Sequence, residues 1–161
     1  MSNHNAVTNV VVAGLGGQGV LKASDILADA AFRAGFDVKK SELHGMSQRG
    51  GSVSSDVRFG EKVLSPMVPP GQAHFLVVVA EGQVENNQWQ LAEGGMLISP
   101  RLIDEKVLRN KKSLNVALLG VLSTRLEIAE AHWLEAIRSN LAEKLHEANF
   151  QAFAAGRAAA G

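Results

Sequence analysis

The first part of the chain places apolar runs and glycines in the order of a strand, a helix and a second strand. Residues 9–13 form a short apolar run that leads into Gly14-Leu-Gly-Gly-Gln-Gly19, which is typical of a buried strand in a parallel sheet. Apolar residues then recur at helical spacing over residues 20–34, with Gly35 as a C-cap. Residues 36–43 are predicted to form a second strand. We therefore expect residues 9–43 to be one right-handed β-α-β unit with parallel strands.

Three more strands are predicted in the middle of the chain. Apolar and polar residues alternate from Val53 to Phe59, which indicates a half-buried strand. Residues 65–71 contain three prolines and are expected to be an irregular connection. The unbroken apolar run 75–80 predicts a strand, and residues 96–99 predict another. Between them we expect a helix over residues 86–92, ended by the pair Gly94-Gly95.

The last third of the chain has a helical period. Residues 116–126 and 132–145 are predicted to be helices, and the alanine-rich residues 148–160 either extend the second or start a last one. No internal repeat or linker divides the chain, so we expect residues 1–161 to be a single domain. The predicted fold is α/β, a three-layer domain with a parallel-rich sheet, helices on both faces and a Rossmann-like glycine turn after the first strand.

Composition excludes several classes of function. The 161 residues include 16 acidic and 16 basic side chains, so no excess of positive charge indicates a nucleic-acid partner. No segment approaches the roughly 20 apolar residues that span a bilayer, and none reads as a signal peptide, so no membrane partner and a cytoplasmic location are expected. The chain has no cysteine, which removes the ordinary ligands of an iron–sulfur cluster.

The glycine turn is the first candidate site. Gly14, Gly16 and Gly19 satisfy G-x-G-x-x-G between a predicted strand and helix, where exposed amides at the helix N-terminus favour a phosphate or carboxylate. The same turn can serve only to pack the helix against the sheet. Binding of NAD in the usual way is disfavoured, because the acidic residue expected about 20 positions on is missing: Asp37 starts the second strand and Glu42 comes late. A P-loop lysine is also absent.

The second candidate site is the polar, glycine-rich stretch 41–52. It follows the second predicted strand, so it is expected at the same edge of the sheet as the glycine turn, where open α/β sheets bind ligands and partners. Arg49 offers a fork of donors for a phosphate or carboxylate, and His44 is of the type that exchanges protons near neutral pH. A salt-bridged arginine and a loop-capping histidine are the alternative interpretations.

Taken together, the two stretches resemble a known family. Gly14-Leu-Gly-Gly-Gln-Gly19 followed by Ser41-Glu-Leu-His-Gly-Met-Ser-Gln-Arg-Gly-Gly-Ser52 is similar to the gamma domain of pyruvate/ketoisovalerate-type 2-oxoacid:ferredoxin oxidoreductases. The sequence His-Gly-Met-Ser-Gln-Arg-Gly-Gly looks most like beta subunits of the indolepyruvate:ferredoxin type. Residues 115–120, 134–137 and 149–153 extend the resemblance over nearly the whole chain. The chain is somewhat short for such a subunit, with a compact stretch between Gly95 and Leu114.

The resemblance implies a small, non-catalytic subunit that is inactive in isolation. In such enzymes a 2-oxoacid is oxidatively decarboxylated on thiamine diphosphate, and iron–sulfur clusters pass the electrons to ferredoxin or another acceptor, usually leaving an acyl-CoA. This chain lacks cysteines and the Gly-Asp-Gly signature of thiamine diphosphate binding. The resemblance therefore places thiamine diphosphate, magnesium and the clusters on a large catalytic partner, with coenzyme A as a co-substrate and an arylpyruvate as the 2-oxoacid.

The resemblance also implies that the two stretches face that partner, where they shape the interface or hold a substrate carboxylate or a coenzyme A phosphate. No residue of the chain is predicted to be catalytic or to bind a metal. The residues expected to bind a cofactor or face the partner are Gly14, Gly16, Gly17, Gln18, Gly19, Ser41, Glu42, His44, Gly45, Met46, Ser47, Gln48, Arg49, Gly50, Gly51 and Ser52.

Two alternatives remain open from the sequence. The chain could be a stand-alone nucleotide-binding or regulatory module that uses the glycine turn. It could also be an NAD-linked dehydrogenase, with His44 as the proton-transfer residue. Nucleotide binding without turnover would favour the first alternative, and hydride transfer by the isolated chain would favour the second.

Overall fold

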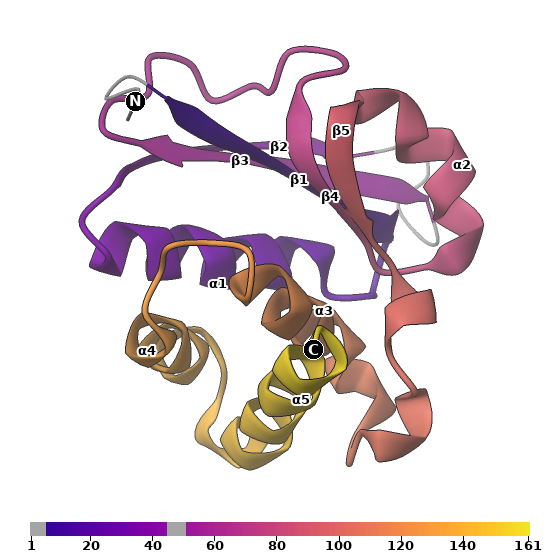
Figure 1. The fold of residues 1–161 in the computed structure, drawn as a ribbon. Coiled ribbons are helices and arrows are strands. Elements are labelled where there is room, and N and C mark those ends of the chain that lie inside the picture. The colour runs from indigo at the N-terminus through magenta and orange to yellow at the C-terminus, as the bar shows by residue number, and fades with distance from the viewer. Residues whose placement is uncertain (1–5, 45–50) are drawn as a thin grey trace.

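A computed structural model describes residues 6–44 and 51–161, which form a mixed five-stranded sheet with helices against it (Figure 1). The strands lie in the order β2-β3-β1-β4-β5. β4 and β5 run parallel to β1, whereas β3 is antiparallel to both of its neighbours. The strands are β1 (Val7–Leu15), β2 (Asp37–His44), β3 (Ser52–Gly60), β4 (Ala73–Val78) and β5 (Leu91–Ile98).

The α/β fold and the strand–helix–strand order at the start of the chain are confirmed. β1 leads into helix α1 (Val20–Arg33), and β2 follows. β1 and β2 point the same way, because both are antiparallel to β3, but β3 lies between them. Four of the five strands therefore share one direction, and the chain segments that follow β1 and β2 leave the same edge of the sheet.

The longer helices gather on one face of the sheet (Figure 1). They are α1, α3 (Leu114–Ser123), α4 (Glu130–Asn140) and α5 (His146–Ala159). The opposite face buries a smaller cluster that includes Val11, Leu76 and Val78, with Val68 and Val84 packed against it. Val84 starts the four-residue helix α2 (Val84–Asn87), and Val68 belongs to the proline-containing connection between β3 and β4. Helical cover is thus unequal on the two faces.

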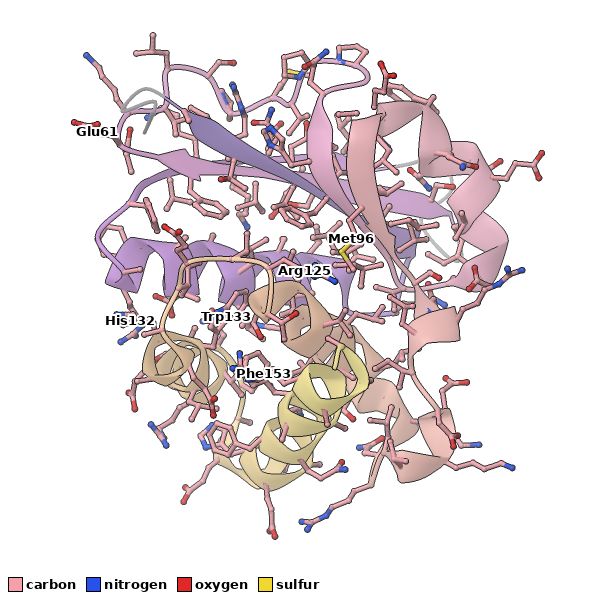
Figure 2. All side chains as sticks on the ribbon, in the orientation of Figure 1. Glu61, Met96, Arg125, His132, Trp133 and Phe153 are labelled. Atoms are coloured by element: carbon pink, nitrogen blue, oxygen red, sulfur yellow. The ribbon has the colours of Figure 1, made fainter. Side chains whose placement is uncertain are left out.

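The helices α3 and α5 pack with almost no side-chain layer between them. A Cβ added to Gly120 would lie 2.2 Å from the Phe153 carbonyl oxygen, and one added to Gly156 would lie 1.8 Å from that of Ala117. Next to this crossing, the rings of Trp133 and Phe153 lie 5.7 Å apart and are buried (Figure 2). The glycines therefore set the distance between the two helices.

Two predicted helices differ from the structure. The helix expected over residues 86–92 ends at Asn87, and β5 begins at Leu91 and contains both Gly94 and Gly95. Gly94 has φ +77° and lies at a shift of register between β4 and β5, so the glycines form a bulge instead of a helix end. The helix expected over residues 132–145 stops at Asn140, because Leu141 is extended.

Short helical turns fill the remaining connections. Three of them make up most of the compact stretch between β5 and α3, and they are Pro100–Leu102, Glu105–Val107 and Lys111–Ser113. Further turns are Glu81–Gln83, Gln88–Gln90 and Glu143–Leu145. None of the helices found in the described residues combines the length and the apolar character that crossing a membrane requires.

Candidate functional site: the glycine turn and its edge of the sheet

The glycine turn connects the end of β1 to the start of α1, and its glycines have different structural roles. Gly17 and Gly19 have φ +86° and +77°, which only glycine adopts without strain. The Gln18 side chain folds back, and its Oε1 accepts a hydrogen bond of 2.7 Å from the Leu15 amide. A Cβ on Gly14 would lie 3.0 Å from that oxygen and 2.9 Å from Val20 Cγ2. Gly14 and Gln18 therefore build the turn itself.

Gly19 brings the first turns of two helices together. It is the N-cap residue of α1, where no side chain caps the helix amides. The Asn115 side chain, in the first turn of α3, donates a hydrogen bond of 3.0 Å to the Gly19 carbonyl. A Cβ at position 19 would lie 2.5 Å from Asn115 Nδ2, so a larger residue would separate the helices. Both helix N-termini carry partial positive charge from unpaired amides.

A cavity of about 430 Å³ opens beside this junction. Two lysines from the turn before α3, Lys111 and Lys112, line it, and both are exposed. Glu105 is the acidic residue of its lining. Two cationic side chains and two helix N-termini together favour an anion such as a phosphate or carboxylate. The remaining lining residues are Gly17, Gln18, Gly19, Val79, Leu114 and Asn115.

The end of the second predicted stretch contacts the glycine turn. The Gly16 amide donates a hydrogen bond of 2.9 Å to the Gly51 carbonyl, and Ser52 at the start of β3 is paired with Leu15. The Ser52 hydroxyl also donates to Gln83 Oε1 at 3.0 Å. The stretch therefore contacts the turn through the start of β3, which is the strand next to β1, and not through β2.

The other residues of the second stretch are divided between a strand and an undescribed segment. Ser41 and Glu42 lie within β2, with β3 between them and β1. Glu42 pairs with Lys40 at 2.7 Å, and Lys40 also pairs with Asp25. Burial lowers the pKa of Lys40, but its hydrogen bonds to both carboxylates outweigh that effect and raise it. The His44 side chain and Gly45, Met46, Ser47, Gln48, Arg49 and Gly50 lie outside the described residues.

Lys111 and Lys112 were not identified from the sequence. They are more than 90 positions from the glycine turn, and they lie in a stretch without periodicity. One local signal was available, since Lys-Lys-Ser directly precedes the apolar run that becomes α3. Only the packing of α3 against α1 brings this segment to Gly19. In the described part of the chain, no three His, Asp or Glu side chains lie close enough to hold a metal ion.

The chain is similar in sequence to proteins of one family. Residues 9–103 match the family model of pyruvate ferredoxin/flavodoxin oxidoreductases. The chain is 44% identical over 91 residues to the indolepyruvate oxidoreductase subunit IorB of Thermococcus kodakarensis. The aligned residues make up 56% of this chain and 45% of that protein. It is 32% identical over 120 residues to the common gamma subunit of the pyruvate/ketoisovalerate oxidoreductases of Thermococcus litoralis, covering 71% and 65%. The matches thus span about half to two thirds of these relatives.

Solved structures share the fold. The gamma subunit of a keto/oxoacid ferredoxin oxidoreductase from Geobacter sulfurreducens superposes with a TM-score of 0.80 at 22% identity, covering 95% of this chain and 98% of that one. A 2-oxoglutarate:ferredoxin oxidoreductase from Magnetococcus marinus gives a TM-score of 0.79, covering 96% of this chain and 31% of that one. The family match includes both the glycine turn and the stretch 41–52. The chain therefore belongs to the pyruvate ferredoxin/flavodoxin oxidoreductase family.

Proposed function

We propose that this chain is the small, non-catalytic subunit of a 2-oxoacid:ferredoxin oxidoreductase that acts on arylpyruvates such as indolepyruvate. The family match over residues 9–103 carries this proposal. The preference for an arylpyruvate is supported by the 44% identity to an indolepyruvate oxidoreductase subunit. In the complete enzyme, the 2-oxoacid and coenzyme A yield an acyl-CoA, carbon dioxide, a proton and two electrons, which pass to two ferredoxins or another acceptor.

The cofactors of this reaction are assigned to a large partner subunit. The chain has no cysteine to hold an iron–sulfur cluster, and its described acidic side chains form no cluster that fits a metal ion. In our proposal thiamine diphosphate, magnesium and the clusters are therefore held by the partner. The complex is proposed to be cytoplasmic, with no nucleic-acid or membrane partner.

The contribution of this chain is to complete the region beside the partner's active site. The glycine turn, the residues Gly51 and Ser52 and the two lysines lie at one edge of the sheet. In our proposal the cavity beside Gly19 receives an anionic group of the substrates, with a phosphate of coenzyme A as the best fit for Lys111 and Lys112. Arg49, in the adjoining stretch, is proposed to contact the partner or the 2-oxoacid carboxylate.

Co-expression with the large subunit tests the proposal. We expect the two chains to co-purify, and we expect dye reduction with indolepyruvate or phenylpyruvate only when both are present. Turnover should require thiamine diphosphate, and it should be faster with an arylpyruvate than with pyruvate. Isolation of the chain from its native cells as a single species with a bound nucleotide would instead favour the nucleotide-binding module.

A single substitution tests the part proposed for the stretch 41–52. We expect Arg49→Ala to leave the thermal unfolding midpoint of the isolated chain unchanged, because Arg49 lies in no apolar run of the sequence. Assembly with the large subunit or turnover of the complex should fall about tenfold, since one charge-assisted contact is lost. Arg138→Ala removes an arginine on α4, far from this edge in sequence, and serves as the control. Normal assembly and turnover of Arg49→Ala would exclude Arg49 from the interface.

A further inference from the structure

A second cleft lies between the sheet and the segment that follows α3, at the end of β1 opposite the glycine turn. β1 spans about 30 Å with its nine residues, whereas the ten residues of α3 span about 15 Å. α3 begins beside Gly19, so it ends before it reaches the first residues of β1. The connection 125–127 lines the helix-facing side of the sheet there, and a cleft of about 680 Å³ lies between the two.

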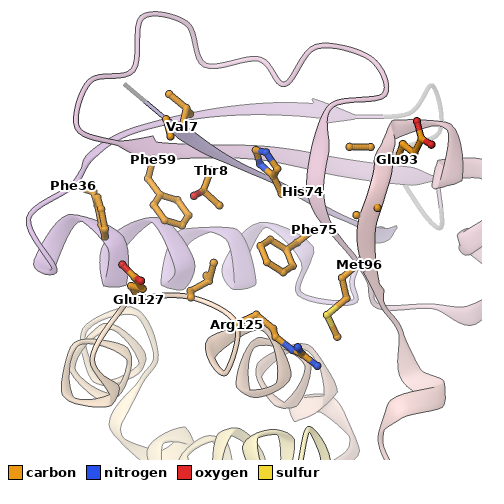
Figure 3. A pocket seen from close by; sticks show the side chains of 15 residues that line it. Val7, Thr8, Phe36, Phe59, His74, Phe75, Glu93, Met96, Arg125 and Glu127 are labelled. Atoms are coloured by element: carbon orange, nitrogen blue, oxygen red, sulfur yellow. The ribbon is translucent and has the colours of Figure 1, made fainter. Parts of the chain in front are cut away.

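The cleft has an aromatic and apolar floor. Phe59 on β3, Phe75 on β4 and Met96 on β5 line it, and Phe36 lies at one end (Figure 3). Phe59 is buried, but Phe36, Phe75 and Met96 stay half-buried. The rings of Phe36 and Phe59 are tilted against each other with centroids 5.3 Å apart. The volume lies in the range of small-molecule sites, which are mostly apolar with a few polar groups at defined positions.

Arg125 supplies a charged group at this cleft. It follows α3, where the helix dipole favours a cation, and its side chain is exposed. No carboxylate of the described residues lies within 4.0 Å of its guanidinium. Two acidic residues also line the cleft. Glu127 lies at the Phe36 end, whereas Arg125 lies at the Met96 end, and Glu93 on β5 lies away from Arg125 (Figure 3).

We infer that this cleft binds a small carboxylic acid with a flat apolar body, such as an arylacetate. The carboxylate pairs with the Arg125 guanidinium, which has the fork geometry that binds both oxygens. The ring lies against Phe75 and Met96, where it covers apolar surface and gains an aromatic and a sulfur contact. The nine residues of β1 separate this site from the glycine turn, so the inference does not depend on the proposed enzyme function.

Titration of the full chain with phenylacetate, followed by amide chemical shifts in NMR spectra, tests the inference. We expect saturable binding, with shifts confined to the start of β1, to the residues around Phe75 on β4 and Met96 on β5, and to residues 125–127. The uncharged analogue 2-phenylethanol should bind about fivefold more weakly, because it cannot form the ion pair. Phenylacetate binding to Arg125→Gln should weaken by about the same factor. In that variant the two compounds should bind equally, which assigns the preference for the acid to this side chain.

Arg109→Gln is the matched control, because it removes an exposed arginine that pairs with Glu147 elsewhere on the surface. It should leave phenylacetate binding unchanged. Equal affinity of the wild-type chain for the acid and the alcohol would overturn the inference, as would shifts centred on the glycine turn. If the cleft residues shifted only when the large subunit was added, the cleft would be a protein interface and the ligand site would be rejected.

Discussion

At the scale of single residues, two glycines of the same turn differ in what their missing side chain allows. Gly17 and Gly19 both have positive φ. A Cβ on Gly17 would meet nothing within 4 Å, whereas a Cβ on Gly19 would meet the Asn115 amide at 2.5 Å. Gly17 is therefore required only for its backbone conformation, and Gly19 is also required for the approach of α3.

This difference predicts two unequal losses of stability. Gly17→Ala should lower the free energy of unfolding by about 1 kcal/mol, the cost of the left-handed conformation. Gly19→Ala should lower it by at least about 2 kcal/mol, because Asn115 must also move away. Urea unfolding of both variants measures the difference. Equal losses would show that the contact between Gly19 and Asn115 does not constrain the helices.

Asp56 is a buried carboxyl on β3 that accepts a hydrogen bond of 2.9 Å from the Val68 amide. Burial raises its pKa above the usual range, although the hydrogen bond and the Arg58 charge act in the opposite direction. A carboxyl with a higher pKa in the folded state than in the unfolded state favours folding when protonated. Its contribution to stability therefore falls as the pH rises through the ordinary aspartate pKa to the raised one, and it stays low above that pH.

Asp56→Asn tests this sign, since asparagine cannot ionise but can still accept from Val68. The free energy of unfolding of the variant, relative to the wild-type chain, should be higher at pH 7 than at pH 3. Urea unfolding at the two pH values measures it. Asp104→Asn is the control, because Asp104 is exposed and also accepts a backbone amide, from Lys106 at 3.0 Å. A relative stability of Asp56→Asn that does not depend on pH would contradict the assignment.

At the scale of elements, the crossing of α3 and α5 depends on Gly120 and Gly156. Gly120→Ala would place a methyl group 2.2 Å from the Phe153 carbonyl oxygen, so the helices would have to separate. We expect a loss of about 3 kcal/mol in the free energy of unfolding, despite the higher helix propensity of alanine. Gly82→Ala, where the new Cβ meets nothing within 4 Å, should change it by less than about 0.5 kcal/mol. A similar small change at Gly120 would contradict the close crossing.

The sequence predicted those elements whose pattern is set by their own residues. β1, α1 and β4 were found because unbroken apolar runs and a helical period are local signals. The strand was predicted to begin at residue 96, whereas β5 begins at Leu91. A glycine with positive φ can end a helix or form a bulge, and only the pairing with β4 distinguishes the two. The position of β3 between β1 and β2 was not predictable either, since it depends on contacts between distant segments.

The residues of the candidate site were likewise predictable only where their signal is local. The glycine turn was identified because its spacing and its place after a strand are local features. The spacing of the glycines did not predict that the Gln18 side chain accepts a hydrogen bond from the Leu15 amide. That contact depends on a side-chain conformation. Lys111 and Lys112 were missed because α3 must first dock against α1 before they reach the turn.

At the scale of the whole molecule, two candidate sites of different chemistry lie at opposite ends of β1. One edge joins two helix N-termini, two lysines and the glycine turn, an arrangement suited to a strongly charged anion. The opposite end holds an aromatic cleft with a single arginine, which suits a singly charged and mostly apolar acid. The short α3 produces both features, because its start closes the first site and its end leaves the second open.

The first of these sites can be tested in the assembled enzyme. The double variant Lys111→Gln/Lys112→Gln should raise the KM for coenzyme A by about threefold to tenfold, because two exposed charge-assisted contacts to a phosphate are lost. The KM for the 2-oxoacid should not change, and the difference from the wild-type enzyme should shrink at high salt because ions screen exposed charges. Lys39→Gln/Lys62→Gln, on β2 and on the connection after β3, removes the same charge elsewhere and should leave both KM values unchanged. If the lysine variant assembles normally and its KM for coenzyme A is unaltered, the cavity beside Gly19 does not hold the coenzyme A phosphate. If the variant fails to assemble, the two lysines belong to the partner interface instead.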